Sequence, residues 1–311
     1  MFTKEKYLKY VLSLIPENEK LIINKDIVFK NSMSEFELIN TRISDCSFGE
    51  SYCKAINYTG AEPHMFNYKF VIFESVELVT SIRFIGKDKN KPFVQLEYID
   101  NPFEIDTTLF KKLIKHILNI YRIFSVSKIR MFLNNIKLDS WRDREFTIDQ
   151  LIYAIPITNI KSPTINNDIR FEKTTELSSV DYETYINDYN SYHRRYIEMS
   201  NIKPIPFSTL SLLFKEELCY KIYYKDEWAG ISCFELSEDK FIYGVYVYEQ
   251  CIFEKFKGKE LASYSQKYIV SNYLNKYEGY LYGLIDGNNI ASAISAKKVG
   301  RYAIAANIFI Y

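Results

Sequence analysis

The sequence predicts an α+β protein made of two domains that repeat one order of helices and strands. The chain has 311 residues, and single hydrophobic cores tend to divide beyond about 250–300 residues. A polar stretch rich in Asn, Ser and Pro at 158–168 separates two segments that are dense in apolar residues, as a linker does. The segments on either side show a similar order of elements, although convergent α/β layering would give the same likeness.

The second half is expected to be mixed, with one strand–helix–strand crossover in its middle. β-Branched and aromatic residues fill 240–253, which indicates a strand buried on both faces. Leu261, Tyr264 and Tyr268 recur at helical spacing in the segment that follows. The other strands are expected at 169–176, 280–285 and 302–311, with a hairpin at 219–236 that turns near Asp226 and Glu227. The helices are expected at 181–196, 208–215, 260–277 and 290–299.

The first half has a fainter copy of this order. Its opening residues predict an amphipathic helix, since the apolar run at 10–15 is too short for a secretory signal. The remaining elements are expected as a hairpin at 70–88, a strand at 92–99, a helix at 107–124, and strands at 128–133 and 150–157.

Charge and composition exclude several classes of function. The chain has 40 Lys and Arg residues against 39 Asp and Glu, a formal net charge of +1, so no global field attracts nucleic acid or an anionic membrane. No apolar run reaches the roughly 18 residues of a transmembrane helix. We therefore expect a cytoplasmic protein without a nucleic-acid or membrane partner.

The cysteines and histidines suggest neither disulfides nor a metal site. The five cysteines form no CxxC pair, and the odd count argues against a disulfide framework. The three histidines show no metal-ligand spacing. Buried free thiols are the simplest interpretation, and no metal is expected.

The stretch IFEKFKGKELASY at 252–264 places Lys257, Gly258 and Lys259 between an expected strand and an expected helix. A glycine-bearing loop at a helix N-terminus offers unpaired backbone N–H groups and the positive end of the helix dipole, which together bind phosphate groups. Lysines at such a turn are also common as solvated surface charges, so the loop alone is a weak signal.

The segment 252–262 resembles the acetyl-CoA loop of the GNAT superfamily of N-acetyltransferases, whose pattern is V-x-P-x-Y-R-G-K-G-L/I-G/A. Lys257 stands in for the Arg, Gly258 for the next Gly and Ala262 for the last small residue. Glu260 departs from the pattern, because glycine is usual at that position.

A second segment, NIASAISAKKVG at 289–300, is similar to the N-x-x-S-x-x-x-x-x-K-x-G pattern of the GNAT branch that includes ribosomal-protein N-acetyltransferases. Asn289, Ser292, Lys298 and Gly300 match, but Arg301 stands where an aromatic residue normally follows. Alone, this segment is equally typical of a capped surface helix. The order and separation of the two motifs favour the resemblance over residues 165–311.

The resemblance implies two GNAT-like mixed-sheet domains in tandem, each with a central, mostly antiparallel sheet flanked by helices. Their expected ranges are 1–157 and 165–311. It also implies acetyl-CoA, or another acyl-CoA, as the donor. The donor would be held by the end of the central strand at Cys251 and Ile252, by the loop residues Lys257, Gly258, Lys259, Glu260, Leu261, Ala262 and Ser263, and by Asn289 and Ser292. Glu260 is expected to face solvent, so that only its backbone N–H would meet the phosphates, and its replacement by glycine is expected to weaken the helix.

Alternation along the central strand places Gly244, Tyr246, Tyr248 and Gln250 on one face, the face on which relatives often carry catalytic groups. Tyr246 and Tyr248 are therefore the catalytic candidates, with core packing as the alternative for each. The tyrosine that many relatives use to protonate the departing thiolate would fall near Ala296, so Tyr302 or a water molecule would have to replace it. The segment that shapes the acceptor pocket in relatives contains His193, Arg194 and Arg195, which could hold an anionic group or form an exposed surface.

The corresponding loop of the first half, at 100–106, has three carboxylates, one proline and no glycine. Such a loop is a poor site for phosphate. The first half is therefore expected to lack a CoA site and to have a structural role.

These features predict an N-acyltransferase that moves acetyl from acetyl-CoA to an amine by direct attack in a ternary complex. The alternatives are a longer acyl-CoA or acyl-carrier protein as donor, and a non-catalytic CoA-binding or scaffold protein. A small-molecule amine is the expected acceptor, although a protein or peptide amine is also compatible, and the chain is expected to be a monomer or homodimer.

Overall fold

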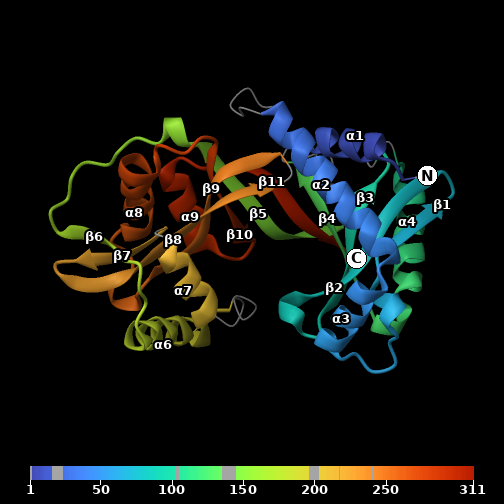
Figure 1. The fold of residues 1–311 in the computed structure, drawn as a ribbon, viewed down its shortest axis with the longest axis horizontal. Helices are drawn as coiled ribbons and strands as arrows, with labels where there is room; N and C mark the ends of the chain where they lie inside the picture. Colours follow the sequence, from blue (N-terminus) through green and yellow to red (C-terminus); the bar gives the residue numbers. More distant parts are fainter. Residues whose placement is uncertain are drawn as a thin grey trace. The chain divides into compact units, whose positions relative to one another are not determined.

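The computed structural model describes residues 2–15, 24–101, 105–134, 145–195, 203–216, 218–239 and 241–311, and the side chains of 192–195 lie outside this description. The chain forms two compact units. One contains Met1–Leu151 together with Ile304–Tyr311, and the other contains Ile152–Ala303. Figure 1 colours the chain from its N-terminus in blue to its C-terminus in red.

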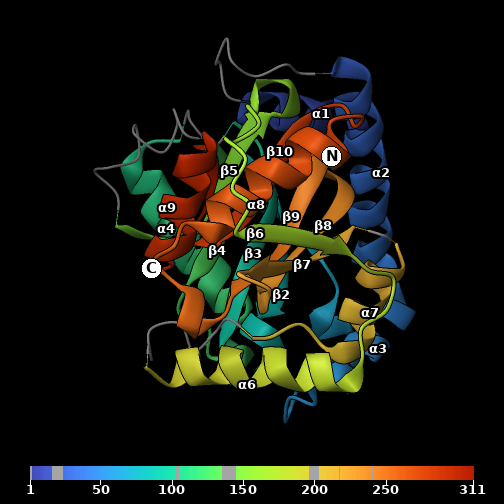
Figure 2. The same ribbon diagram turned by 90° about the vertical axis from the view of Figure 1, so that its left-hand side faces the viewer.

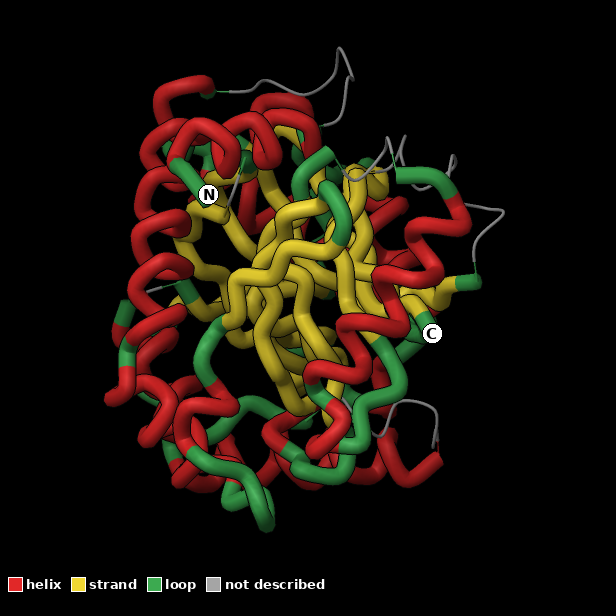
Figure 3. Tube along the Cα trace, turned by 90° about the vertical axis from the view of Figure 1, so that its right-hand side faces the viewer, coloured by secondary structure: helices red, strands yellow, loops and turns green. Residues whose placement is uncertain are grey.

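The first unit has strands in the order β1-β2-β3-β4-β11. All neighbouring strands are antiparallel except β3 and β4. These strands are β1 (Lys69–Phe73), β2 (Val76–Phe84), β3 (Pro92–Ile99), β4 (Ile129–Asn134) and β11 (Tyr302–Ile310). The helices of this unit are α1 (Lys4–Leu14), α2 (Lys25–Ser44), α3 (Cys46–Ile56) and α4 (Thr107–Ile120). Figure 3 shows strands in yellow with helices in red beside them.

Helix α4 connects the parallel strands β3 and β4, and its sequence explains both its start and its packing. Phe110, Leu113, Ile114 and Ile117 are buried, the spacing of one helix face. Asp106 caps the helix, because its carboxylate accepts hydrogen bonds from the N–H groups of Thr108 and Leu109 at 2.8 and 2.9 Å.

The second unit has strands in the order β5-β10-β9-β8-β7-β6, and Figure 2 views it end on. Strands β6 to β9 are antiparallel, whereas β9 and β10 are parallel and joined through α8. The strands are β5 (Phe146–Pro156), which enters from the first unit, β6 (Ile169–Lys173), β7 (Cys219–Tyr224), β8 (Glu227–Asp239), β9 (Ile242–Ile252) and β10 (Tyr280–Asp286). The helices are α6 (Ser179–Arg195), α7 (Phe207–Lys215), α8 (Leu261–Ile269) and α9 (Ile290–Val299).

Two apolar clusters cover the two faces of the strands in the second unit. The cluster on the α6 and α7 side includes Tyr185, Leu210 and Cys233. The cluster on the α8 and α9 side includes Phe234, Ile269 and Val299. Because neighbours such as Cys233 and Phe234 belong to different clusters, β8 buries both of its faces, as a central strand does.

The predicted fold class is confirmed: each unit has mixed, mostly antiparallel strands flanked by helices. Helix α8, however, is shorter than the predicted 260–277, because it ends at Ile269 and passes into a π-helical turn at Val270–Leu274. Ser271 donates its hydroxyl to the carbonyl of Lys267 at 2.7 Å, and the amide of Asn272 donates to that of Tyr268 at 2.8 Å. Such bonds compete with the regular helical pattern.

The compact units also differ from the expected ranges 1–157 and 165–311. The second unit begins at Ile152, and Ile304–Tyr311 belongs to the first unit. The reason is strand pairing, because Ala305 to Ile310 of β11 pair with Asn134 to Ile129 of β4. No helix in the described ranges is long and apolar enough to cross a lipid bilayer.

Candidate active site

The loop between β9 and α8 presents a helix N-terminus without a side-chain cap. After β9, a short 3₁₀ turn at Glu254–Phe256 leads to Gly258, which has φ of 80°, and to Glu260, which has φ of 59°. Glu260 accepts the N–H of Tyr264 through its carbonyl at 3.0 Å. No side chain of the described residues caps α8, so the N–H groups of Leu261, Ala262 and Ser263 have no acceptor within the helix. These groups can bind an anion.

The three lysines of the loop are each engaged locally. Lys255 pairs with Glu227, and Lys257 pairs with Glu254 at 3.1 Å. The ammonium group of Lys259 lies 5.1 Å from the ring centre of Tyr224. These contacts are exposed and cost little to rearrange, so the lysines remain available to add positive charge near the start of α8.

Glu260 faces solvent, as expected, and pairs with a residue of the second motif. Its carboxylate lies 2.6 Å from the ammonium nitrogen of Lys298 in α9. The hydrogen bond from Lys298 lowers the pKa of Glu260 below its ordinary value. The ion pair therefore links the two sequence motifs and neutralises the carboxylate that departs from the family pattern.

Asn289 and Ser292 form a local cap at the start of α9. The side-chain oxygen of Asn289 accepts the N–H of Ser292 at 3.1 Å. This contact explains why these residue types stand at this spacing. Within the described chain, it is Lys298 that joins the second motif to the loop.

Strands β9 and β10 diverge close to this loop. Their parallel pairing covers only Gly244 to Tyr246 with Tyr280 to Tyr282. Beyond Tyr246, β9 continues to pair with β8 as far as Ile252. Cys251 and Ile252 thus lie on a strand end whose other edge is not paired with β10, although the Cys251 side chain is buried in the cluster on the α6 and α7 side.

A β-bulge changes the faces on which the β9 side chains lie. The pairing with β8 shifts between Cys233 and Phe234, because these residues face Glu249 and Val247 and leave Tyr248 as the extra residue. Gln250 consequently lies on the α8 side, where its amide oxygen accepts from Ser232 at 2.8 Å and from Gln266 of α8 at 3.1 Å. The prediction that Gln250 shares a face with Tyr246 is therefore wrong.

The two predicted catalytic tyrosines lie together. The rings of Tyr246 and Tyr248 meet edge to face with centres 6.1 Å apart. Tyr248 is 38% exposed. Burial, followed by the nearby Tyr248, raises the pKa of Tyr246, whose hydroxyl is bound to the N–H of Leu284. Tyr246 is thus held against β10, while Tyr248 remains accessible.

Glu249 is the functional candidate that the sequence analysis missed. Its carboxylate accepts the hydroxyl of Tyr185 at 3.0 Å and the N–H of Gln250 at 3.0 Å. Burial raises the pKa of Glu249 from its ordinary value to about 7, against the effect of these two hydrogen bonds. A carboxylate inside an aromatic, β-branched strand is the signal that could have identified it, but simple alternation assigns it to the other face.

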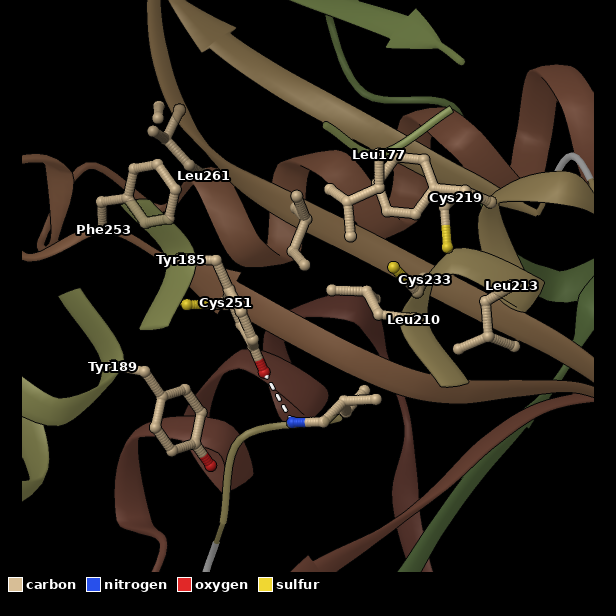
Figure 4. Close-up of a cluster of buried hydrophobic side chains, with 14 of the residues drawn as sticks. Leu177, Tyr185, Tyr189, Leu210, Leu213, Cys219, Cys233, Cys251, Phe253 and Leu261 are labelled. Atoms are coloured by element: carbon tan, nitrogen blue, oxygen red, sulfur yellow. Dashed lines mark hydrogen bonds between the residues drawn. The ribbon is translucent and has the colours of Figure 1, made fainter. Parts of the chain in front are cut away.

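Helix α6 supplies Tyr185, which contacts this carboxylate, and Tyr189, and Figure 4 shows both tyrosines in the buried apolar cluster. The hydroxyl of Tyr185 also accepts the N–H of Ile205 at 3.1 Å, so its orientation is fixed. Burial and then the charge of Glu249 raise the pKa of Tyr185 and Tyr189. Asp188 accepts the N–H of Glu254 at 2.9 Å, which ties α6 to the loop before α8.

Ala296 and Tyr302, the positions considered for protonating the departing thiolate, are both described by the structure. Ala296 is fully buried and offers no hydroxyl. The hydroxyl of Tyr302 is buried and has no hydrogen-bond partner among the described residues. The side chains of His193, Arg194 and Arg195 lie outside the described part of the chain. Within that part, no group of three or more His, Cys, Asp or Glu side chains could hold a metal ion.

Comparison with known proteins identifies the fold through structure alone. No protein-family profile and no curated protein matches the sequence. A GCN5-related N-acetyltransferase from Sphaerobacter thermophilus superposes with a TM-score of 0.50 at 10% identity, covering 81% of this chain and 82% of that one. A GNAT-family acetyltransferase from Colwellia psychrerythraea superposes with a TM-score of 0.49 at 12% identity, covering 89% of this chain and 96% of that one. A tandem GNAT protein from the clavulanic acid biosynthesis pathway superposes with a TM-score of 0.45 at 8% identity, covering 86% of this chain and 95% of that one.

Proposed function

We propose that this chain, which has the fold of the GCN5-related N-acetyltransferases, transfers an acyl group from a CoA thioester to an amine, with Glu249 as the general base. One observation carries the proposal. A carboxylate whose pKa is raised to about 7 lies on β9 beyond its pairing with β10, and the same strand leads to the uncapped start of α8.

The loop fits the phosphates of CoA. The N–H groups of Leu261, Ala262 and Ser263 lack acceptors within the helix, and the dipole of α8 adds positive potential there. A Cβ atom at Gly258 would meet nothing within 4 Å, so that side of the loop is open to a ligand. The unpaired edge of β9 near Cys251 and Ile252 offers backbone groups to the pantetheine amides, as the resemblance implies.

Glu249 suits the proton transfer that this reaction needs. An amine is protonated near neutral pH, and only its neutral form attacks a thioester. With a pKa of about 7, the carboxylate is partly ionised at that pH and can accept the proton of the ammonium group. The amine nitrogen then forms a bond to the carbonyl carbon, the carbon–sulfur bond breaks, and CoA leaves as its thiolate. The proton that the nitrogen loses on becoming an amide passes to this thiolate.

The acceptor amine is expected to approach from the α6 side, because Glu249, Tyr185 and Tyr189 lie there. A small molecule remains the preferred acceptor class, with a peptide or protein amine as the alternative. Acetyl is the first acyl group to test in the donor.

The test measures CoA thiol release with a set of acyl-CoA donors and amine acceptors. Glu249→Gln is expected to lower kcat/KM by about 10²-fold or more, the usual contribution of a general base. Glu172→Gln is the matched control, since Glu172 pairs with Arg170 on β6 and its side chain is 41% exposed. Equal activity of the wild type and Glu249→Gln would remove Glu249 from the mechanism. Tight CoA binding without thiol release for any donor would support the non-catalytic alternative.

A further inference from the structure

Arg301 is a buried cation directly after α9. It is only 4% exposed, and its backbone N–H donates to the carbonyl of Ala296 at 3.0 Å. Its Nε atom is buried without a hydrogen-bond partner among the described residues. The family pattern has an aromatic residue here, so a guanidinium group needs its own explanation.

No carboxylate in the described part of the chain forms an ion pair with Arg301. The guanidinium group of Arg301 interacts with Tyr153, which is not a carboxylate. Burial lowers the pKa of Arg301 to about 10, which still leaves the side chain cationic at neutral pH. A buried charge without a counter-ion is costly to keep, so a bound anion would stabilise this arrangement.

The guanidinium lies against β9 and β10 one residue beyond their last assigned pair, at a point where the two strands are still in contact. Its Nη1 atom is 3.2 Å from the position that a Cβ atom of Gly283 would take, and the Cβ and carbonyl oxygen of Val247 are 3.4 and 3.5 Å from that position. Gly283 and Val247 are the first residues beyond the last recorded pair, Tyr282 with Tyr246. Because residue 283 is glycine, the guanidinium group can approach this point closely.

Arg301 and Glu249 belong to opposite sides of the strands. Val247, the neighbour of Arg301, packs against the cluster on the α8 and α9 side. Glu249 is bonded to Tyr185 of α6, on the other side. The phosphates of CoA already have a site at the start of α8. An anion near Arg301 is therefore best supplied by the acyl group itself.

We propose that Arg301 binds a carboxylate at the end of the donor's acyl chain, so that the preferred donor is the CoA thioester of a dicarboxylic acid. This inference rests on the proposed acyltransferase function. The planar guanidinium matches a carboxylate with two parallel hydrogen bonds. The carboxylate does not react, and its role is to select the donor and to orient the thioester.

The first experiment measures binding and needs no acceptor. Calorimetry compares succinyl-CoA with butyryl-CoA, which have equal chain lengths but differ in the terminal group, and uses free CoA as the reference. In the wild type, succinyl-CoA is expected to bind about tenfold more tightly or better than butyryl-CoA. Glutaryl-CoA with valeryl-CoA, and malonyl-CoA with propionyl-CoA, test the effect of chain length.

The second experiment changes the cation. Arg301→Met keeps the length of the side chain, removes its charge, and is expected to bring the two donors within about threefold of each other, with butyryl-CoA binding retained. Arg301→Lys should keep part of the preference. Arg170→Met, at an exposed position on β6, should leave it unchanged.

The outcomes separate this inference from the proposed function. Free CoA binding without preference for any carboxylated donor in the wild type would overturn the role of Arg301 and leave the acyltransferase intact, whether or not the variants fold. An equal loss of affinity for all thioesters in Arg301→Met would also overturn it, since the residue would then contact the common part of CoA. No binding of CoA in any form would reject the acyltransferase function itself.

Discussion

Glu249 combines a polar partner with an apolar site, and this combination gives its carboxylate a pKa suited to proton transfer. Desolvation raises the pKa to about 7, while Tyr185 and the N–H of Gln250 limit the rise. The bulge at Tyr248 is what turns this carboxylate toward α6. A regular strand would have placed it among the side chains of the α8 side.

The activity of the protein is expected to depend on pH through this group. Because the ionised carboxylate is the base, kcat/KM should rise with pH and level off above about 7. Glu249→Gln should lose this rise along with most of its activity. A pH profile of thiol release by the wild type that stays flat between pH 5.5 and 8.5 would contradict the assignment.

The free energy of unfolding should fall as the pH rises, whereas the activity should increase. The folded-state pKa of Glu249 is raised above its ordinary value of 4.5, so the folded state holds the proton more tightly than the unfolded state. This contribution is complete below about pH 4.5 and is lost as the pH rises through about 7. Glu249→Gln should therefore increase the free energy of unfolding at pH 9 by about 1–3 kcal/mol, as urea denaturation can measure. An unchanged or lower stability of the variant at pH 9 would argue against a desolvated carboxylate.

Glu260 leads to a prediction that reverses the expectation from sequence. Glu260 is not inside the helix but precedes it, with φ of 59°, a conformation that glycine adopts without strain. Glu260→Gly should therefore leave the free energy of unfolding unchanged or raise it, and CoA affinity should change little.

Lys298→Met is the control for Glu260→Gly, because it removes the same exposed ion pair without changing the backbone at 260. Thermal unfolding and calorimetry would measure both variants. A lower stability for Glu260→Gly than for Lys298→Met would show that the conformation at 260 is not the reason for the family's glycine.

Among the elements, the α8 N-terminus differs from its counterpart in the first unit. The first N–H groups of α4 are bound by the carboxylate of Asp106, whereas no described side chain caps α8. This contrast gives a structural reason for the sequence-based expectation that only the second half binds CoA, an expectation that remains to be tested.

Gly258→Asp should weaken CoA binding by at least about tenfold, because a carboxylate would stand beside the expected phosphates. Gly258→Ala is the matched control, since Gly258 has φ of 80° and both side chains impose the same backbone strain. Calorimetry would compare the two variants. Equal affinities would show that the loop is an ordinary solvated turn.

The elements themselves were largely predictable, since periodicity and β-branched runs located the strands and most helices. The bulge in β9 was not predictable, because it depends on how β9 pairs with Cys233 and Phe234 of β8. Those residues lie outside the local pattern of β9 itself. The same holds for Glu249: its role depends on Tyr185, 64 residues earlier in the chain. The motif residues, in contrast, were found because their spacing is local.

At the scale of the whole molecule, CoA is expected to protect backbone amides in only one unit. Hydrogen exchange should slow in the loop and first turn of α8, at 257–264, and along the end of β9 when CoA is added. No such protection is expected for β3 or the start of α4, where Asp106 already binds the N–H groups. Equal protection in both units would contradict a single CoA site.

The boundary between the units was the least predictable feature of the chain. The polar stretch at 158–168 suggested a linker there, yet the contacts divide the chain after Leu151 and return Ile304–Tyr311 to the first unit. The pairing of β11 with β4 joins segments far apart in sequence, and local composition carries no signal of such a pairing.

This pairing has a consequence for biosynthesis. Domains usually fold from the N-terminus onward as the ribosome releases them, but here the first unit needs Ile304–Tyr311, which is synthesised after all of the second unit. Until β11 has been synthesised, the edge of β4 that β11 will occupy lacks this partner, and an exposed strand edge invites association with other chains. The first unit therefore gains its last strand only after the second unit has been made, and β11 protects the edge of β4 against aggregation.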